Sequence, residues 1–201
     1  MADGKEVASP RIFVLSGKRK SGKDFIAGKL KYAFGCDKCN IIRLSGPLKR
    51  EYAKQNGLDF DRLMDSTTYK ELYRQKMIGW GEEKRNTDSY YFCRLAVEMI
   101  LAENCGETLS LPKPVWIISD ARRKTDVRYF KENYDKVVSV RINASEETRR
   151  SRGWVFTPGV DDAESECGLD NEIFDVVIQN DGDEQQLEKN LNYLRTYACS
   201  S

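Results

Sequence analysis

The chain has 201 residues, enough for one α/β domain with a hydrophobic core of its own. Its 33 Lys and Arg residues nearly balance 32 Asp and Glu residues, and the resulting net charge of +1 argues against a dedicated nucleic-acid-binding protein. Because the sequence has no histidine, imidazole catalysis and Ser-His-Asp or Cys-His nucleophiles are excluded, whereas phosphoryl transfer by Lys, Arg, carboxylates and a hard metal ion stays open.

The first predicted strand, residues 12–15, leads into a glycine-rich loop and then into a predicted helix, residues 23–34. The loop reads GKRKSGKD over residues 17–24. This order of strand, loop and helix is typical of a phosphate-binding loop (P-loop), because the glycines let the backbone fold round an anion and the amides at the helix start point toward it. We therefore expect nucleotide phosphates here, with Lys23 bridging the β- and γ-phosphates.

The loop matches the pattern GxxxxGK[ST] except at its last position, where Asp24 replaces the usual hydroxyl residue. That hydroxyl is a Mg²⁺ ligand in P-loop enzymes, and a carboxylate can bind the ion directly or through water, so Asp24 is a candidate metal ligand. A basic surface patch or nuclear-import signal is the alternative interpretation of Lys18, Arg19 and Lys20. Such a patch has no need of two spaced glycines between a strand and a helix.

Two more predicted elements follow, a strand at residues 40–44 and a helix at about residues 48–55. Apolar residues then recur at three- and four-residue steps over about residues 58–105. We interpret this helical region as an insertion that grips a substrate, because it is longer than a βαβ crossover requires. Cys36 and Cys39 form a CxxC pair, but without a second pair or a histidine we expect an ordinary loop with reduced thiols.

A polar loop, residues 104–114, precedes a strongly apolar predicted strand at residues 114–119. This strand ends in Asp120, and Arg122 and Arg123 follow at once. An acid at the carboxyl end of a strand beside a P-loop is where a residue that organises Mg²⁺ belongs, so Asp120 is a second candidate metal ligand. The two arginines suit phosphate, because each guanidinium offers a fixed fork of donors.

The remaining predicted elements are a helix, a strand, a basic helix capped by Ser145, a last strand and a C-terminal helix. Between the basic helix and the last strand, residues 153–171 are rich in acids and turn residues without a regular period, so we expect a mobile lid. In the basic helix, Arg149 and Arg150 are each as easily solvated surface residues as ligands. The predicted ranges are about residues 125–133, 137–142, 145–152, 174–178 and a last helix to about residue 197.

Strands alternate with helices along the chain, which predicts a mainly parallel five-stranded sheet with helices on both faces. Ligands of such sheets bind at the carboxyl ends of the strands, where the P-loop, the segment after Asp120 and the predicted lid fall. A nucleoside triphosphate and a phosphorylated acceptor together bring about six negative charges, so several cations should gather there. An acceptor phosphate is already ionised at pH 7 and needs no general base, although a sugar or alcohol acceptor stays open. The candidate cations are Lys18, Arg19, Lys20, Lys23, Lys84, Arg85, Arg122, Arg123, Arg141 and Arg152.

Five segments of the chain resemble those of animal phosphomevalonate kinases, a family that carries Asp at the position of Asp24. The resemblance runs from about residue 11 into the C-terminal helix, and the long acidic segment alone is distinctive. Residues 104–114 form a longer loop than the family usually has. The segments are residues 17–24 (GKRKSGKD), 44–49 (LSGPLK), 80–85 (WGEEKR), 119–123 (SDARR) and 152–170 (RGWVFTPGVDDAESECGLD).

The resemblance implies a fold like that of nucleoside-monophosphate kinases, a P-loop three-layer α/β/α sandwich in one domain, residues 1–201. The implied core comprises about residues 11–57, 112–152 and 172–201, with a helical substrate-binding region at about 58–105 and a lid at about 153–171. The implied reaction transfers the ATP γ-phosphoryl group to (R)-5-phosphomevalonate, giving ADP and (R)-5-diphosphomevalonate, in the mevalonate route to isoprenoids and sterols.

Position by position, the resemblance also implies roles for single residues. Lys23, Arg19, Arg122 and Arg123 would be catalytic, and Asp24 and Asp120 would serve Mg²⁺. The implied ATP ligands are Gly17, Lys18, Arg19, Lys20, Ser21, Gly22, Lys23, Asp24, Arg141, Arg152, Asp181 and Asn190. The implied contacts of the acceptor are Arg19, Lys49, Arg85, Arg122, Arg123 and Asn180.

Other functions stay open at this point. A kinase of a nucleoside monophosphate or of another small phosphorylated metabolite fits the same scaffold. A GTPase switch is disfavoured because the sequence has no NKxD motif, and a nucleic-acid binder would show salt-sensitive affinity. Since we find no signal peptide, no apolar run of membrane-spanning length and no SKL-like terminus, we expect a cytosolic monomer whose partners are small substrates, not nucleic acid or a membrane.

Overall fold

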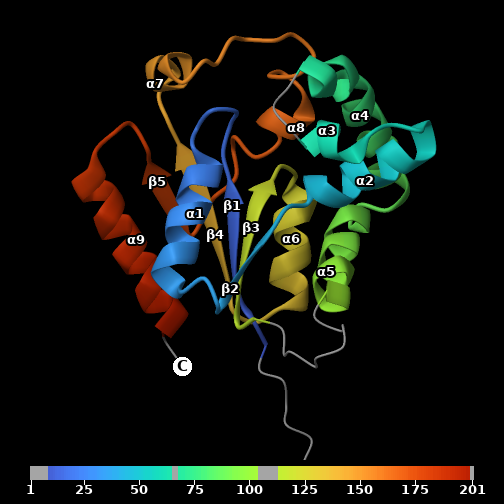
Figure 1. Ribbon diagram of the computed structural model, residues 1–201. Coiled ribbons are helices and arrows are strands. Elements are labelled where there is room, and N and C mark those ends of the chain that lie inside the picture. Colours follow the sequence, from blue (N-terminus) through green and yellow to red (C-terminus); the bar gives the residue numbers. More distant parts are fainter. Residues whose placement is uncertain (1–8, 65–67, 104–112, 200–201) are drawn as a thin grey trace, which may run out of the picture.

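The computed structural model describes residues 9–64, 68–103 and 113–199, and at its centre lies a sheet of five parallel strands (Figure 1). The strand order is β2-β3-β1-β4-β5, so the parallel sheet expected from the sequence is confirmed. Because β1 is central, the loop that follows it emerges between β3 and β4 at the carboxyl edge of the sheet. The strands are β1 (Arg11–Ser16), β2 (Cys39–Ile42), β3 (Val115–Ala121), β4 (Val137–Asn143) and β5 (Val176–Gln179).

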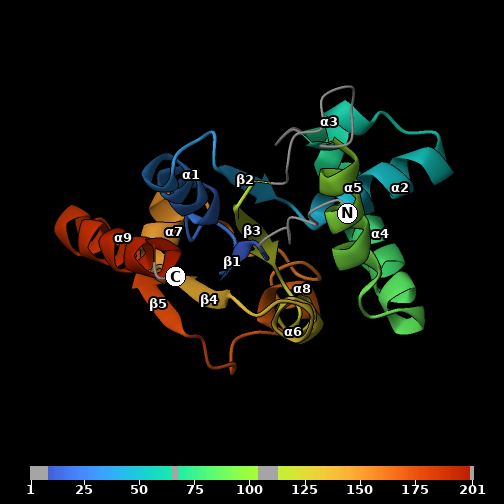
Figure 2. The same ribbon diagram turned by 90° about the horizontal axis from the view of Figure 1, so that it is seen from below.

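One face of the sheet is covered by α1 (Lys23–Phe34) and α9 (Glu184–Cys199), which lie side by side (Figure 2). Alternate residues of a strand point to opposite faces, and Phe13 of β1 points to this one. It is buried there with Leu30 of α1 and Leu194 of α9, both fully buried. The two helices therefore form one outer layer of the sandwich.

The other face is covered by α5 (Tyr91–Glu103) and α6 (Lys124–Asn133) (Figure 2). Val14 of β1 and Ile118 of β3 point to this face and are fully buried. They belong to the same buried cluster as Phe130 of α6. The sheet is thus the middle of three layers, which holds β1 and its following loop in a fixed place.

A further group of helices stands beside the β2 edge, near the carboxyl ends of the strands (Figure 1). It consists of α2 (Ser45–Asn56), α3 (Phe60–Met64) and α4 (Thr68–Thr87). These helices share a small core of their own, in which Leu63 is fully buried and Tyr52 nearly so. The arrangement places one long face of α4 beside the strand ends.

Two short helices lie over the carboxyl ends of the strands, α7 (Glu146–Ser151) and α8 (Glu164–Cys167) (Figure 1). Ser145 caps α7 as predicted, since its hydroxyl accepts the backbone N–H of Thr148 at 3.1 Å. The segment expected to have no regular structure contains α8, which corrects that expectation. The division of the whole chain into a core, a helical substrate-binding region and a lid stays a prediction.

Two predicted boundaries near the sheet edge are wrong for one physical reason. β3 continues to Ala121 and so includes Asp120, and α2 begins at Ser45, earlier than the predicted residue 48. The Asp120 carboxylate accepts the backbone N–H groups of Leu44 at 2.7 Å and Ser45 at 3.1 Å. These bonds satisfy amides at the start of α2, so the helix can begin directly after β2.

Two smaller corrections concern β2 and β5. Cys39 is the first, buried residue of β2, although the CxxC segment was expected to be a loop, and burial raises the pKa of its thiol to about 12. β5 begins two residues later than predicted, because Asp175 turns to accept the backbone N–H of Ser139 at 2.8 Å. Neither change moves the carboxyl edge of the sheet.

Some expectations fall outside the described residues. They concern the long loop, of which residues 104–112 are not described, and the last two residues of the chain. In the ranges that are described, no helix is both long and apolar enough to cross a lipid bilayer.

Candidate active site

The loop between β1 and α1 packs tightly against the ends of β4 and β5. Gly22 has a φ of 94°, a left-handed conformation that glycine adopts without steric cost. A Cβ atom at Gly22 would lie 2.2 Å from Asn180 Nδ2, and one at Gly17 would lie 2.3 Å from Ile142 O. Only glycine allows this approach at both positions. The helix α1 begins directly after the loop, at Lys23, so its first amides face the cleft described below.

Lys23 folds back over the loop, where its ammonium donates to the carbonyls of Gly17 and Lys18, the second at 3.2 Å. Removal of water from around the ammonium, followed by the charge of Arg122, holds the pKa of Lys23 well below its usual value. The Asp120 carboxylate opposes this shift. A phosphate in the loop would give the ammonium charged acceptors, which are stronger than these carbonyls.

A cleft of about 740 Å³ opens in front of the loop, at the carboxyl ends of the strands. Its walls come from the P-loop, α1, α2, α4 and the end of β3. The structure thus brings together side chains that lie up to a hundred and more residues apart in the sequence. The predicted site residues that line the cleft are Lys18, Arg19, Lys20, Gly22, Lys23, Asp24, Lys49, Asp120, Arg122 and Arg152.

Arg152 and Asn180 hold the P-loop in place through hydrogen bonds to its backbone. Arg152 donates from Nη1 to the carbonyl of Ser21 at 3.2 Å and from Nη2 to that of Asn180 at 2.8 Å. Asn180 is buried, and its Nδ2 donates to the same Ser21 carbonyl at 2.8 Å. The Ser21 hydroxyl is also buried and meets no hydrogen-bond partner among the described residues. Asn180 therefore supports the loop in this structure, and only Arg152 also lines the cleft.

A smaller cavity of about 130 Å³ adjoins the cleft and combines apolar side chains such as Leu48 and Met77 with Arg85 and Arg123. Arg123 is only 6% exposed. Its Nη2 donates to Glu82, but within the described residues neither its Nε nor its Nη1 meets an acceptor. Leaving buried charged donors unpaired is costly, so this cavity is suited to a second anion.

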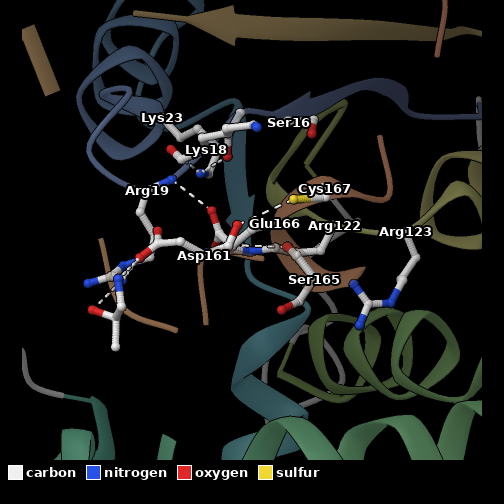
Figure 3. Close-up of polar contacts among 12 residues, drawn as sticks. Ser16, Lys18, Arg19, Lys23, Arg122, Arg123, Asp161, Ser165, Glu166 and Cys167 are labelled. Carbon is white, nitrogen blue, oxygen red and sulfur yellow. Dashed lines mark hydrogen bonds and ion pairs between the residues drawn. The ribbon is translucent and has the colours of Figure 1, made fainter. Parts of the chain in front are cut away.

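Two carboxylates of the acidic segment, residues 153–171, lie against arginines of the site, and one of them, Glu166, lines the smaller cavity (Figure 3). Glu166 of α8 pairs through one oxygen with Arg122, and its other oxygen accepts the backbone N–H of Arg19 at 2.9 Å. Asp161 accepts the Arg19 guanidinium at 2.7 Å. Both carboxylates are buried, with exposed fractions of 7% and 8%. Glu166 and Asp161 thus occupy donors that the sequence assigns to phosphate.

Asp170 holds two further predicted phosphate ligands. It pairs with Lys18 at 2.6 Å and with Arg141 at 2.7 Å. Arg141 also donates to the Ser16 hydroxyl at 2.9 Å. It lies on β4 and lines a separate cavity of about 380 Å³ beside the P-loop. The structure therefore places Arg141 behind the loop and outside the set of residues that line the main cleft.

Two other residues assigned to ATP also lie away from the cleft lining. Asp181 is exposed and accepts the backbone N–H of Ser145 at 2.8 Å, which joins the loop after β5 to the start of α7. Asn190 lies in α9, where its carbonyl accepts a long hydrogen bond of 3.4 Å from Gln186. Neither Asp181 nor Asn190 is among the residues that line the cleft.

The two arginines of α7 that the sequence left open have different environments. Arg149 is buried, donates from Nε to the backbone carbonyl of Arg19 at 2.8 Å and lies 4.0 Å from the centre of the Trp154 ring. Loss of water lowers its pKa, which the nearby Asp161 carboxylate opposes. Arg150 is exposed and pairs with Glu146 on its own helix. Arg149 therefore supports Arg19, whereas Arg150 is a surface residue.

The sequence interpretation missed Lys70 and Arg74, which also line the cleft. Both lie on α4, on the face that also carries Arg85, since steps of four and eleven residues return to the same side of a helix. A step of eleven residues back from Arg85 leads to Arg74, and a further step of four leads to Lys70, so the helical period could have identified both. Arg43 was missed as well; it pairs with Asp24 at 3.2 Å and has no such periodic signal.

The two predicted Mg²⁺ ligands both line the cleft. The Asp24 side chain is exposed apart from its contact with Arg43. Asp120 already accepts two backbone N–H groups, but a carboxylate has about four acceptor positions. Mg²⁺ bound with a nucleotide needs only one or two carboxylates, because phosphate oxygens and water complete its shell. The oxygen donors present fit such an ion.

Known proteins resemble the chain in sequence and in structure. A family profile described as phosphomevalonate kinase matches residues 15–136. The phosphomevalonate kinase of Drosophila melanogaster is 44% identical over 175 residues, which cover 85% of this chain and 88% of that protein. Shikimate kinase from Bacteroides thetaiotaomicron aligns with a TM-score of 0.46 and 14% identity over 96% of this chain and 100% of that one. A gluconokinase from Sinorhizobium meliloti 1021 aligns with a TM-score of 0.44 and 16% identity over 96% and 98%.

Proposed function

Since the chain belongs to the phosphomevalonate kinase family, we propose that its cleft holds ATP and (R)-5-phosphomevalonate side by side. The enzyme transfers the γ-phosphoryl group of ATP to the acceptor phosphate, giving ADP and (R)-5-diphosphomevalonate, a step of the mevalonate pathway. An oxygen of the acceptor phosphate bonds to the γ-phosphorus as the bond from that phosphorus to the β,γ-bridging oxygen breaks, and ADP keeps the electron pair. The attacking oxygen is ionised at pH 7, so no residue has to remove a proton.

One observation carries this proposal: the cleft in front of the P-loop and the smaller arginine-lined cavity share a wall. A nucleotide at the P-loop and an acidic acceptor in the cavity would meet at this wall, where cations balance the charge of both. Such preorganised charge is the main source of catalysis in phosphoryl transfer. The shared residues are Ser45, Lys49, Lys70, Arg74, Asp120 and Arg122.

We assign ATP to the P-loop side of the cleft. The triphosphate would take the loop amides and draw the Lys23 ammonium away from its backbone carbonyls toward the β- and γ-phosphates. Arg152 would lie near the phosphates from the end of α7. Arg141, Asp181 and Asn190 stay proposed ATP residues by family resemblance, with less geometric support because they do not line the cleft.

We assign the acceptor to the α4 side. Its phosphate would lie near Arg19 of the P-loop, which lines the cleft, and near Arg122, which lines both the cleft and the smaller cavity. Its carboxylate would extend into the smaller cavity, where Arg123 keeps two donors without a partner among the described residues and Arg85 adds a second positive charge. Lys49 lines both cavities and would lie between the phosphate and the carboxylate of the acceptor. The roughly apolar wall of the cavity suits the carbon skeleton between the two anions.

Asp24 and Asp120 are the residues that would hold Mg²⁺ with the nucleotide. When bound, the ion would supply positive charge that stabilises the negatively charged transition state. Asp120 has a further task in this chain, because its bonds to Leu44 and Ser45 keep the start of α2 beside the sheet edge. We therefore expect Asp120 to serve both the helix and the cleft.

The test is an acceptor scan with purified protein, ATP and Mg²⁺. We expect ADP release with phosphomevalonate and little with mevalonate, AMP or CMP. Phosphorus NMR should show a new diphosphate whose formation equals that of ADP. Turnover of a nucleotide without turnover of phosphomevalonate would make the protein a nucleotide kinase and contradict the proposed acceptor. Omission of Mg²⁺ should abolish turnover in the same assay.

A further inference from the structure

A buried carboxylate that the reaction does not use lies beside the acceptor cavity. Asp126, in the first turn of α6, is 1% exposed. It faces the guanidinium of Arg85 and accepts the backbone N–H groups of Arg122 and Arg123, and all three arginines line the cavity. Asp126 is absent from that lining. It therefore stands behind the arginines, as seen from the substrate.

The two carboxylate oxygens of Asp126 contact different groups. Oδ2 accepts the backbone N–H of Arg122 at 2.8 Å and that of Arg123 at 3.0 Å. Two bonds to consecutive amides fix the turn between β3 and α6, and with it the directions in which the two side chains leave the backbone. Oδ1 faces the guanidinium of Arg85 at 3.8 Å and the thiol of Cys93 at 3.8 Å.

Capping of α6 alone would account for only part of this arrangement. A carboxylate at the third helical position commonly accepts the N–H of the residue that precedes the helix, here Arg123. The contact with Arg85 lies outside that motif, because Arg85 comes from α4, forty-one residues earlier in the chain. One carboxylate thus joins the two elements that carry the arginines.

The charges explain why a carboxylate is needed at this point. Three guanidinium groups at one wall repel one another, and Arg85 has an exposed side-chain fraction of only 14%. A buried charge without a partner is strongly unfavourable, so without Asp126 the Arg85 side chain would turn toward solvent or toward Glu82, which already accepts Arg123. Either movement would change the cavity that receives the acceptor.

We propose that Asp126 is a positioning residue, which holds Arg85, Arg122 and Arg123 in the arrangement that binds the acceptor. This inference rests on the proposed function, because it takes the smaller cavity as the acceptor site. It predicts a selective effect: loss of the carboxylate changes how the acceptor binds, whereas the P-loop and its nucleotide are unaffected.

The first variant is Asp126→Asn, which is nearly the same size and keeps an oxygen for the two backbone amides. Its amide nitrogen would face Arg85 donor to donor. We expect the KM for the acceptor to rise about tenfold, as small displacements of binding groups commonly cause, with the KM for ATP changed less than about twofold. The matched control is Asp175→Asn, which removes a carboxylate that also accepts a backbone N–H at 2.8 Å but lies directly before β5 and lines neither the cleft nor the smaller cavity. It should lower the melting temperature and leave both KM values unchanged.

A double-variant comparison tests the link to Arg85. Arg85→Met should raise the acceptor KM on its own, and adding Asp126→Asn to it should add less than about twofold, because the two residues act as a pair. If the two substitutions raised the acceptor KM equally and their effects were fully additive, this result would overturn the proposal. So would an Asp126→Asn protein that melts earlier but keeps the wild-type acceptor KM, since Asp126 would then be only a helix cap.

If the Asn variant does not fold, Asp126→Glu takes its place. Glutamate is a usual residue at this capping position, but its longer side chain moves the carboxylate relative to Arg85. A folded Glu variant with a raised acceptor KM supports the proposal, and one with the wild-type value overturns it. The wild-type acceptor scan comes first. If the wild-type protein does not turn over phosphomevalonate, the proposed function fails. The Asp126 variants are then compared with the acceptor that the wild-type protein does turn over.

Discussion

Glu166 of α8 and Arg122, which follows β3, form an ion pair, and the second Glu166 oxygen accepts the Arg19 amide (Figure 3). One carboxylate therefore connects a P-loop amide with an arginine of the acceptor side. A substrate phosphate at the point where the two substrates meet would use the same two donors, the Arg19 amide and the Arg122 guanidinium. The contact joins the acidic segment to both sides of the site, and substrate phosphates that use these donors have to displace it.

The first prediction concerns this competition. Glu166→Gln removes the charge that competes with phosphate, and an ion pair of about 1 kcal/mol corresponds to about fivefold in a binding constant. We expect the dissociation constant for phosphomevalonate, measured by calorimetry, to fall by about this factor. Asp162→Asn, which changes a neighbouring exposed acid, is the control and should have no effect. Weaker binding by the Gln variant would mean that Glu166 helps to hold the substrate.

The second prediction concerns Lys23. Lys23→Met removes the charge expected to meet the migrating phosphoryl group, so kcat should fall at least about a hundredfold. Lys29→Met alters an exposed lysine of the same helix, whose ammonium lies 5.5 Å from the Phe25 ring centre, and should keep nearly full activity. A Lys23→Met enzyme with a normal kcat would remove this lysine from the mechanism.

The third prediction concerns pH. Burial, followed by the charge of Lys70, lowers the pKa of Lys49 to about 8. Lys49 is therefore mostly charged at pH 7 and loses its charge as the pH rises through about 8. Because kcat/KM reports groups of the enzyme before the acceptor binds, kcat/KM for phosphomevalonate should fall above about pH 8.

The Lys49 assay is run at saturating ATP, whose phosphates keep the Lys23 ammonium charged. Lys49→Arg provides the comparison, since a guanidinium stays charged throughout this range. The variant should lose the decline above pH 8 that the wild-type enzyme shows. If both proteins give the same profile up to pH 9.5, Lys49 does not contribute its charge to acceptor binding.

The fourth prediction compares two glycines close together in the chain. Gly22→Ala places a methyl group 2.2 Å from Asn180 Nδ2 at a φ of 94°, so it should displace Asn180 and weaken ATP binding more than about tenfold. Gly28→Ala lies in α1, where the new methyl group meets nothing within 4 Å beyond its chain neighbours and the backbone of its own helix. It should leave ATP binding unchanged and raise stability by up to about 1 kcal/mol, as alanine favours helix. Calorimetry with ATP and thermal melting distinguish the two results.

Local patterns in the sequence were enough for much of the fold. The P-loop has a strict spacing of glycines between a strand and a helix, and α1 has the predicted bounds, Lys23–Phe34. Strands β1, β3 and β4 are runs of apolar residues that sheet burial requires. Boundaries failed where a distant group decided them, as when Asp120 starts α2 through the amides of Leu44 and Ser45.

The site was predictable where its residues adjoin a strand end and less so elsewhere. Arg122 and Arg123 follow β3 directly, and so their place at the cleft and at the smaller cavity beside it could be inferred. The pairing of Arg19 with Asp161 joins residues 142 positions apart, and no local spacing contains that information. Lys70 and Arg74 stand among many charges on an amphipathic helix, where only the tertiary structure shows which face meets the cleft.

The packing of Trp154 has an optical consequence. This buried indole lies 4.0 Å from the Arg149 guanidinium and donates to Asp161 at 2.9 Å, the same carboxylate that holds Arg19. Any movement that frees Arg19 for a phosphate must change the surroundings of this ring. Fluorescence emission from Trp154, in a protein whose other two tryptophans are replaced by phenylalanine, would therefore report in real time any change of the Arg19–Asp161 contact.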